Sequence, residues 1–203
     1  MTRVTTRTLG LITIVASLIG AACAVAVLVW PPQVGTGWYS YPFDATGYTV
    51  AHVFFAVHHL GMLAGFAGLA RLAATHRTTR AGLIIAAAGM VLLAACELFG
   101  ITAANAPVSS ETANAVDNAY GIPMVLIGVG LVLAGWKGSG WQRWVPLALG
   151  VYVFVPLFPA VFGPMVAGRI AIGVWFAIFA VLGVALVKAA ENVSPAERMP
   201  AAR

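Results

Sequence analysis

The amino-acid sequence predicts an all-α integral membrane protein, a bundle of six transmembrane helices whose N and C termini both lie in the cytoplasm. Three observations lead to this fold class. Of the 203 residues, 61% are hydrophobic and only 8% are charged, and the mean hydropathy is +0.95. The apolar residues form six long runs, and Lys and Arg gather in every second connection between them. Because soluble domains carry about 25% charged and roughly 45–50% apolar residues, most of this surface must face lipid.

Each apolar run is near the length that a transmembrane helix needs. A hydrocarbon core of about 30 Å requires roughly 20 helical residues. The runs lack the strict alternation of a membrane β-strand, so the backbone must satisfy its hydrogen bonds as a helix. The predicted spans, all in one membrane domain covering residues 1–203, are 9–30, 48–70, 81–103, 119–136, 144–163 and 166–188.

The first run has a second interpretation as a targeting segment. Arg3 and Arg7 precede it, as in a secretory signal peptide, and residues 20–23 loosely resemble a lipoprotein cleavage site. However, the apolar residues continue through Trp30, which is longer than the usual apolar region of a signal peptide. We therefore expect this run to be retained as the first span.

The positions of Lys and Arg predict the orientation. Ten of the eleven basic residues lie before span 1, after span 6, or in the connections between spans 2 and 3 and between spans 4 and 5. Only Arg169 lies toward the other side, whose connections carry Asp44, Glu111 and Asp117. The positive-inside rule makes the basic side cytoplasmic, in a multi-pass protein of the cell (plasma) membrane. This placement also argues against a nucleic-acid partner, which the net charge of +5 could otherwise suggest.

Three stretches of the chain look familiar: residues 39–43 (Tyr-Ser-Tyr-Pro-Phe), the pair His58-His59, and residues 168–173 with Trp175. They resemble uncharacterised polytopic membrane proteins of actinobacteria, and the resemblance covers most of the chain. It implies a six-span membrane protein. Since no activity is assigned to that group, the resemblance implies no catalytic residue.

Small residues recur at helical spacing on three spans. Such stripes allow helix backbones to approach closely. We interpret them as contacts between helices of one chain, and a homo-oligomer is the alternative. The residues are Gly61, Gly65 and Gly68 on span 2, Gly82, Ala86 and Gly89 on span 3, and Gly121, Gly128 and Gly135 on span 4.

Few ionisable residues lie inside the spans, and each is a functional-site hypothesis because it is costly in lipid. Span 2 carries His52, His58 and His59, span 3 carries Glu97, and Arg169 begins span 6. His52 and His59 are two helical turns apart and share a face, whereas His58 points elsewhere. From the helix rise, His52 lies roughly 6 Å and Glu97 roughly 9 Å below the outer surface. The two side chains can therefore meet if spans 2 and 3 are neighbours.

A carboxylate beside imidazoles suits general acid–base chemistry. We therefore predict a catalytic group of Glu97, His52 and His59 in the outer half of the membrane. One alternative is a Glu–His hydrogen bond that only joins two helices, with Arg169 reaching the headgroups. The predicted ligand-binding residues around the group are Arg169, Phe55, Trp38 and Tyr41, although aromatic residues of an outer loop also suit the membrane interface.

No cofactor and no metal ion is predicted. Haem ligation by two histidines from different helices needs a second histidine-bearing span, and all the intramembrane histidines lie on one. His52 and His59 are about 10.5 Å apart along the helix axis, too far to share a metal ion at ~2.0–2.2 Å. Without a CxxC motif, Cys23 and Cys96 are expected to be buried free thiols. No P-loop, HExxH or GxSxG motif occurs either.

One span and one connection carry further signals. Pro156 and Pro159 remove helical N–H groups from span 5, which predicts either freed carbonyls beside a cavity or a plain helix end. Residues 105–118 are polar and are predicted to be a solvated loop.

These features rank three functions. The first is binding, with acid–base conversion as an option, of a small hydrophobic (lipid- or isoprenoid-like) molecule in an outer pocket. The second is a small proton-coupled transporter with Glu97 and His59 as protonatable gates. The third is an accessory or scaffold subunit of a membrane complex. A pocket enclosing Glu97 and His52 would favour the first, and a polar path to the cytoplasm would favour the second.

Overall fold

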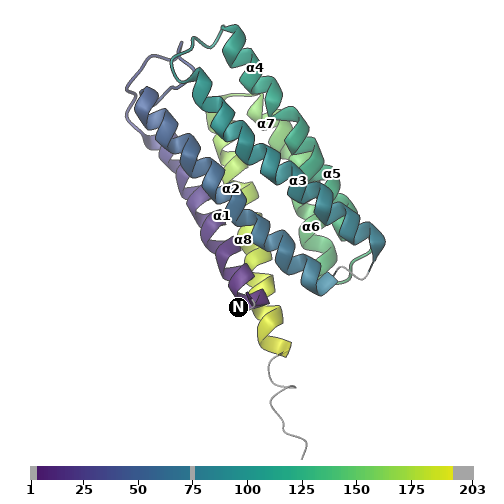
Figure 1. Ribbon diagram of the computed structural model, residues 1–203. Helices are drawn as coiled ribbons and strands as arrows, with labels where there is room; N and C mark the ends of the chain where they lie inside the picture. Colours follow the sequence, from purple (N-terminus) through teal and green to yellow (C-terminus); the bar gives the residue numbers. More distant parts are fainter. Residues whose placement is uncertain (1–3, 74–75, 194–203) are drawn as a thin grey trace, which may run out of the picture.

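The computed structural model describes residues 4–73 and 76–193, which form a bundle of α-helices (Figure 1). Within these ranges six helical segments are long and apolar enough to cross a membrane, which confirms the predicted fold class. Three of the basic residues used to predict the orientation, Arg3, Arg198 and Arg203, lie outside the described residues.

Several of the membrane-spanning segments are built from more than one helix. Five of them begin one to four residues before the predicted spans. In chain order the elements are α1 (Thr6–Val29), α2 (Ala45–Ala73), α3 (Arg77–Gly100), the 3-10 turn η1 (Ile101–Ala103), α4 (Glu111–Ala119), α5 (Gly121–Trp136), α6 (Trp141–Tyr152), the π-helical segment η2 (Val153–Leu157), α7 (Phe158–Val161) and α8 (Met165–Val193).

The fourth segment differs most from its prediction, because the expected loop over 105–118 contains helix α4. The side chain of Ser110 accepts a hydrogen bond from the backbone N–H of Ala113, and Glu111 occupies the first turn. Both features stabilise a helix N-terminus. Ala113 and Val116 bury one face of α4, so this polar segment is anchored to the bundle.

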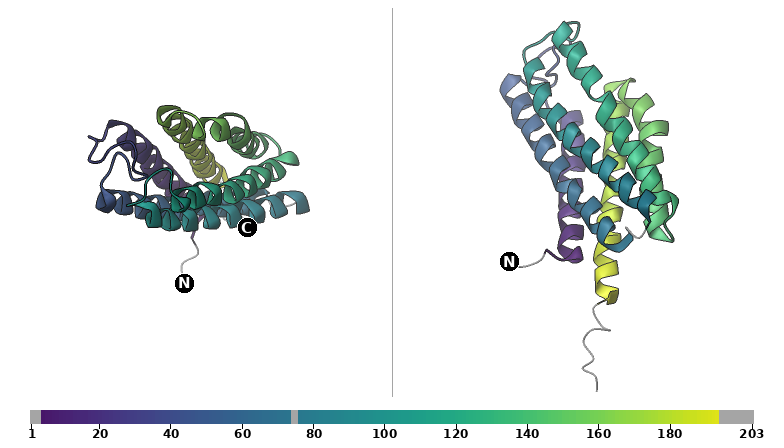
Figure 2. Two further views of the ribbon diagram at one scale, coloured as in Figure 1. Left: turned by 90° about the horizontal axis from the view of Figure 1, so that it is seen from above. Right: turned by 45° about the vertical axis from the view of Figure 1, so that its right-hand side comes forward.

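The helices form a ring around one apolar core (Figure 2). Helix α1 packs against α8 and α2, α3 lies between α2 and α5, and α6 connects α5 with α8. The predicted neighbours, spans 2 and 3, are therefore in contact. Large core side chains come from all sides of the ring, among them Met62, Met90, Ile127, Leu149, Trp175 and Phe179.

Glycines allow α3 and α5 to pack backbone against backbone. A Cβ atom on Gly82 would lie 2.5 Å from the carbonyl oxygen of Gly130, and one on Gly130 would lie 2.6 Å from that of Gly82. These distances leave no room for a methyl group. Gly82 and Gly89 of the predicted stripe on α3 thus contact α5. Of the stripe predicted on α5, Gly128 contacts η2 and Gly135 contacts α6, while Gly121 contacts neither, and a homo-oligomer stays a prediction.

The proline-containing segment η2 is a π-helix and not a plain helix end. Pro156 has no N–H to donate, and the N–H of Phe158 bonds instead to the carbonyl of Val153, five residues earlier. Val153 and Leu157 are buried in the core, so protein packs against this irregular backbone. The helix then continues through α7.

The two ends of the bundle carry opposite charges. Helix α1 begins and α8 ends where the α2–α3 and α5–α6 connections also lie (Figure 1). We call this the basic end, and the end with the 30–44 loop and α4 the acidic end. The described basic residues of the basic end are Arg7, Arg71, Arg77, Arg80, Lys137, Arg143 and Lys188, and the acidic end carries Asp44, Glu111, Asp117 and Arg169. The side of the membrane that each end faces stays a prediction.

The glycine contact between α3 and α5 can be tested with Gly82→Ala. The new methyl group overlaps the backbone of α5, so we expect a loss of stability of about 1–3 kcal/mol, measured by thermal unfolding in detergent. Gly121→Ala is the matched control, since a Cβ there meets no atom within 4 Å. It should leave the Tm unchanged or raise it, because Ala favours helix over Gly. An unchanged or higher Tm for Gly82→Ala would contradict the close approach.

Candidate functional site

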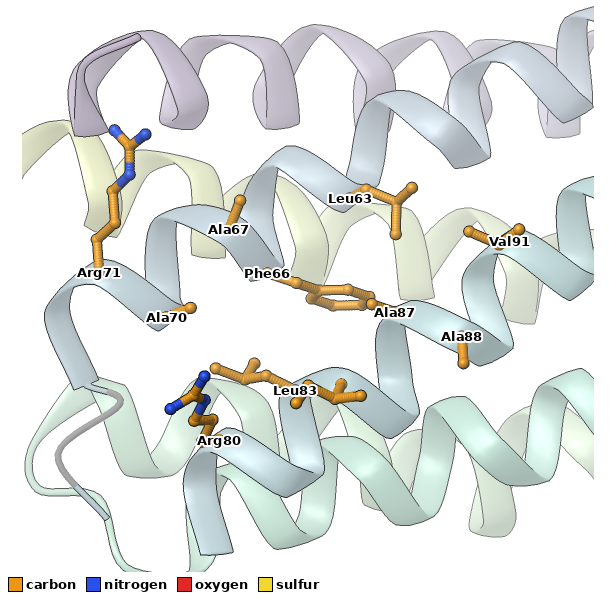
Figure 3. Close-up of a pocket in the computed structure, with 11 residues that line it drawn as sticks. Leu63, Phe66, Ala67, Ala70, Arg71, Arg80, Leu83, Ala87, Ala88 and Val91 are labelled. Carbon is orange, nitrogen blue, oxygen red and sulfur yellow. The ribbon is translucent and has the colours of Figure 1, made fainter. Parts of the chain in front are cut away.

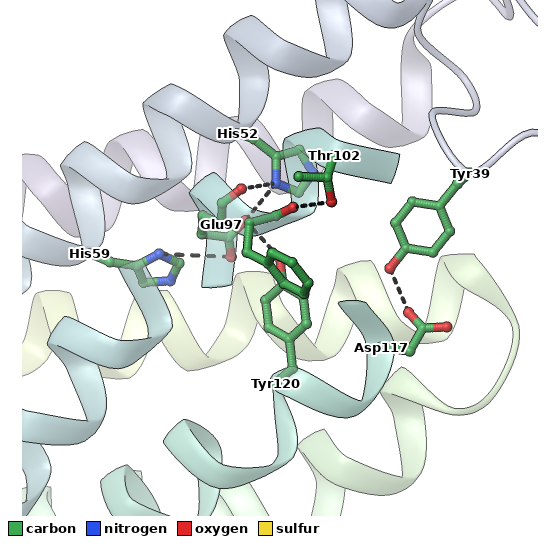
Figure 4. Close-up of polar contacts among 8 residues, drawn as sticks. Tyr39, His52, His59, Glu97, Thr102, Asp117 and Tyr120 are labelled. Atoms are coloured by element: carbon green, nitrogen blue, oxygen red, sulfur yellow. Dashed lines mark hydrogen bonds and ion pairs between the residues drawn. The ribbon is translucent and has the colours of Figure 1, made fainter. Parts of the chain in front are cut away.

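Glu97 on α3 meets His52 and His59 of α2 inside the bundle (Figure 4). The Nδ1 atom of His52 lies 3.0 Å from Oε2 of Glu97 and also 3.0 Å from the Glu97 carbonyl oxygen. The Nδ1 atom of His59 lies 3.9 Å from Oε1, which is an ion-pair distance but too long for a hydrogen bond. Tyr120, at the junction of α4 and α5, donates its hydroxyl to Oε2 at 3.2 Å. These four residues are called the Glu97 cluster.

Burial makes these contacts necessary. The Glu97 residue is only 7% exposed, and both histidines are buried as well. A carboxyl group away from water is costly unless hydrogen-bond donors surround it. Here the donors come from α2 and from the α4–α5 junction, so the cluster ties three parts of the bundle together.

The end of α3 explains how His52 fits so closely. Glu97 lies in the last turn of α3, where a backbone carbonyl lacks its usual partner four residues ahead. Gly100, three residues later, lies on the same face, and a Cβ there would come within 2.9 Å of the His52 Nδ1 atom. The missing side chain of Gly100 therefore lets the imidazole reach both the backbone and the carboxyl group of Glu97.

Aromatic side chains cover the cluster from the acidic end. The rings of Tyr48 and His52 stack at 4.1 Å, and the ring of Tyr39 lies 6.2 Å from that of Tyr48. The hydroxyl of Tyr39 donates to Oδ1 of Asp117 at 2.5 Å, which joins the 30–44 loop to α4. Phe43 packs with Tyr48 in a small apolar cluster. The 30–44 loop thus closes the site through Tyr39 and Phe43.

Only one of the four predicted ligand-binding residues reaches the Glu97 cluster. The ring of Phe55 lies 5.5 Å from that of His52, edge to face. Trp38 is 46% exposed and pairs through its backbone with Pro107 of the other loop. Tyr41 is half-buried, and Arg169 is half-buried in the first turn of α8; within the described ranges neither side chain forms a hydrogen bond or ion pair with the cluster.

Three tyrosines of the site, Tyr39, Tyr48 and Tyr120, were missed by sequence reasoning. Tyr48 precedes His52 by four residues and shares its helix face, a signal that was present in the sequence. Tyr120 and Tyr39 reach their partners across the fold, at separations of 23 and 78 residues. No local pattern could have paired these two.

His58 is a further titratable residue to which the sequence analysis assigned no role. The centroid of its ring lies 4.2 Å from that of His59, with the two planes tilted by 35°, and the His58 ring meets the ring of Phe176 edge to face at 4.8 Å. The residue is 3% exposed, and neither ring nitrogen has a hydrogen-bond partner among the described residues. A buried polar group without a partner is rare in proteins and calls for an explanation.

An apolar groove of about 350 Å³ between α1 and α2 is lined by His58. The other lining side chains are apolar, among them Leu11, Val15, Ile19 and Val57. We call this the His58 groove. A larger groove of about 760 Å³ lies between α2 and α3 near the basic end. Neither groove is lined by Glu97 or His52. Neither groove is therefore the pocket that was expected around these two residues.

The described residues contain neither a metal-binding group nor a disulfide. In the ranges 4–73 and 76–193, no three His, Cys, Asp or Glu side chains are placed to share a metal ion. Cys23 and Cys96 are both free thiols, as expected, and the thiol of Cys96 donates to the carbonyl of Ala119 at 3.4 Å.

No protein-family model, curated protein or solved structure matches this chain. The resemblance to actinobacterial membrane proteins stays a prediction. The function is therefore argued from the geometry of the site.

The protonatable groups form a series that begins at the acidic end and stops inside the bundle. From Tyr39 it runs through Tyr48 and His52 to Glu97, and then through His59 to His58. Beyond His59, the buried face of α2 toward the basic end carries Met62, Gly65, Phe66 and Leu69, which cannot carry a proton. On α1, the hydroxyls of Thr13 and Ser17 bond to carbonyls of their own helix. Within the described residues, the protonatable side chains of this series therefore lie between the acidic end and His58, and the buried face of α2 does not continue them toward the basic end.

The His52–Glu97 contact can be tested by a double-mutant cycle with His52→Phe and Glu97→Gln. We expect a coupling free energy of roughly 0.5–3 kcal/mol, as found for residues in direct contact, from unfolding curves in detergent. A control cycle pairs Glu97→Gln with Thr102→Ala, because the Thr102 hydroxyl bonds to the Phe99 carbonyl and not to the carboxyl group. That pair should be additive. Additivity of the first cycle as well would refute the contact.

The Tyr39–Asp117 hydrogen bond predicts a pH dependence of stability. Burial and the hydrogen bond to Asp117 raise the pKa of Tyr39 above its ordinary value of 10.0. The unfolded chain therefore loses the phenol proton first, and the contribution of Tyr39 is fully present below about pH 10 and lost as the pH rises further. The free-energy difference between the native protein and Tyr39→Phe should be constant from pH 7 to 9 and fall at higher pH. A difference that does not change up to pH 11 would exclude this assignment.

Proposed function

We propose that this protein is a multi-pass protein of the cell membrane, with its basic end in the cytoplasm, that binds a small apolar molecule from the lipid phase and exchanges a proton with it. The observation that carries the proposal is His58. Its imidazole is buried without a hydrogen-bond partner among the described residues, forms part of the wall of a lipid-facing groove, and contacts the ring of His59 in the Glu97 cluster.

The lining of the His58 groove indicates the chemical class of the ligand. Every lining residue except His58 is apolar, so the body of the ligand is a hydrocarbon, such as a lipid or isoprenoid chain. An unpartnered buried imidazole favours a ligand that carries one carbonyl or hydroxyl group, because this group would restore the missing hydrogen bond. Both nitrogens lie beneath the groove surface, so binding requires a rotation of the ring about its broad χ2 torsion.

The Glu97 cluster supplies the acid–base function in this proposal. The centroid of the His58 ring lies 4.2 Å from that of His59, and the His59 Nδ1 atom is 3.9 Å from the Glu97 carboxyl group. Neither contact is a hydrogen bond, so a proton passes from His58 to Glu97 in this proposal only when the rings rotate to bring their nitrogens together. His52 and Tyr120, on the other carboxyl oxygen, lead toward Tyr48 and the acidic end. In this proposal the catalytic role of Glu97, His52 and His59 is limited to proton transfer, because carboxyl and imidazole groups are suited to that step.

The two other candidate functions differ in their support. A proton-coupled transporter would need protonatable groups on both sides of His59, and the described part of α2 toward the basic end supplies apolar core residues instead. A scaffold role has one specific observation in its favour, since the Glu97 cluster links α2, α3 and the α4–α5 junction. We therefore keep the scaffold as the second candidate.

The ligand proposal is tested by mass spectrometry of small molecules retained by the purified protein. Val15→Phe places a larger side chain in the His58 groove and should reduce the retained ligand at least about tenfold. Leu18→Phe is the matched control on α1, because Leu18 is 58% and Val15 57% exposed but only Val15 lines the groove. His58→Phe keeps the ring and removes the nitrogens, and it should also reduce retention.

Two results would overturn the ligand proposal. One is equal retention by the native protein and Val15→Phe. The other is a native protein that retains only bulk membrane lipid, together with a His58→Phe variant of higher thermal stability. The second result would favour the scaffold, because removal of unpartnered polar atoms from a packed core is then purely stabilising.

A further inference from the structure

The larger groove, between α2 and α3, has an apolar body and a charged mouth (Figure 3). Its volume is about 760 Å³. The buried side chains of Phe66 and Leu83 contribute to its floor, and Ala67, Ala88 and Val91 are exposed to the lipid beside it. Arg71 and Arg80 both lie at one end, which is the basic end of the bundle (Figure 3). We call this the arginine groove.

The length of the arginine groove matches one leaflet of a bilayer. Along α2 it extends from Arg71 to Leu63, which is roughly 12 Å at the helical rise, and along α3 from Arg80 to Val91, roughly 16 Å. Half of a hydrocarbon core of about 30 Å is about 15 Å. An acyl chain that enters at the arginines would therefore end near the middle of the membrane, where the groove also ends.

The charge at the mouth is not neutralised by the described part of the chain. Both ion pairs among the described residues involve Glu97, far along α3 from Arg80. Arg71 donates one hydrogen bond to the backbone carbonyl of Val4, which anchors its guanidinium beside the start of α1. A guanidinium has five N–H donors, so most of those on Arg71 remain for an anion. Arg80 is exposed and has no described ion-pair partner.

We propose that the arginine groove binds an anionic phospholipid, with one acyl chain between α2 and α3 and the phosphate at the Arg80 guanidinium. Arg71, whose side chain extends toward α1 in Figure 3, reaches the same phosphate by turning from the Val4 carbonyl. Guanidinium groups bind phosphate oxygens through paired hydrogen bonds. The apolar groove accounts for the chain, and the two arginines account for the preference for a negative headgroup. This site is separate from the His58 groove, which lies on the other side of α2 and is lined by no Lys or Arg.

The test uses the delipidated protein in detergent, titrated with phosphatidylglycerol or phosphatidylcholine and examined by native mass spectrometry. One phosphatidylglycerol molecule should bind, at least about tenfold more tightly than phosphatidylcholine. Each of Arg71→Gln and Arg80→Gln should weaken its binding about five-fold, the effect of one basic residue beside an anionic lipid. Arg77→Gln is the matched control, since Arg77 is exposed at the same end but does not line the groove.

A second pair of variants tests the acyl-chain part of the groove. Ala88→Phe fills the groove and should abolish the tight phosphatidylglycerol site, whereas Ala95→Phe, two turns further along the same face of α3 and outside the lining, should not. Inorganic phosphate at millimolar concentration should weaken the apparent affinity for phosphatidylglycerol by less than about tenfold, because phosphate alone lacks the acyl chain.

Three results would overturn the lipid proposal. The first is equal affinity for both lipids, and the second is an Arg77→Gln effect as large as that of Arg80→Gln, which would indicate a general basic surface. The third is a protein dimer in the mass spectrum that Ala88→Phe dissociates, because the groove would then be the seat of a second copy of this chain. Thermal unfolding of each variant verifies that the fold is retained.

Discussion

A carboxyl group that is kept from water must find its hydrogen-bond donors within the protein, and Glu97 finds them on α2 and at the junction of α4 and α5. The ring of His52 can approach because Gly100 has no side chain, and the hydroxyl of Tyr120 arrives from that junction. Both contact Oε2, so removing either one leaves this buried carboxyl group with one donor fewer, which is costly. The relative positions of α2, α3 and α5 at the acidic end therefore depend on this one side chain.

The same packing separates the acid–base groups from the surfaces that face lipid. Tyr39, Phe43 and Tyr48 cover the cluster from the acidic end, while His58 extends it sideways to a groove between α1 and α2. Aromatic side chains thus cover the cluster at the acidic end, and the apolar groove beside His58 lies on its lipid-facing side. The arginine groove, on the opposite side of α2, has its charge only at the basic end. This difference in lining is the reason that we propose different ligands for the two grooves: an apolar molecule with one polar group, and a phospholipid with an anionic headgroup.

Prediction from the sequence succeeded where a pattern repeats along one helix. The six spans follow from apolar length, and the shared face of His52 and His59 follows from their spacing of seven. It failed where partners come from distant segments. The roles of Trp38 and Tyr41 were assigned from composition alone, but Trp38 is exposed, and Tyr39 between them makes the hydrogen bond to Asp117. The sequence at the start of α4 contains a capping serine and an acidic first turn, which are signals of a helix start, but the polar composition led to the prediction of a loop.

Hydrophobicity, helix length and charge placement act locally, so the sequence alone predicts a six-helix membrane bundle with most of its basic residues at one end. It also predicts that Glu97 can meet His52 if α2 and α3 are neighbours. Which polar groups have partners depends on the tertiary structure. The Oε2 atom of Glu97 contacts both His52 and Tyr120. The nitrogens of His58, in contrast, have no hydrogen-bond partner among the described residues, and the residue lines a groove. This difference arises from the packing of α1 and α8 around α2, which no spacing along a single helix contains.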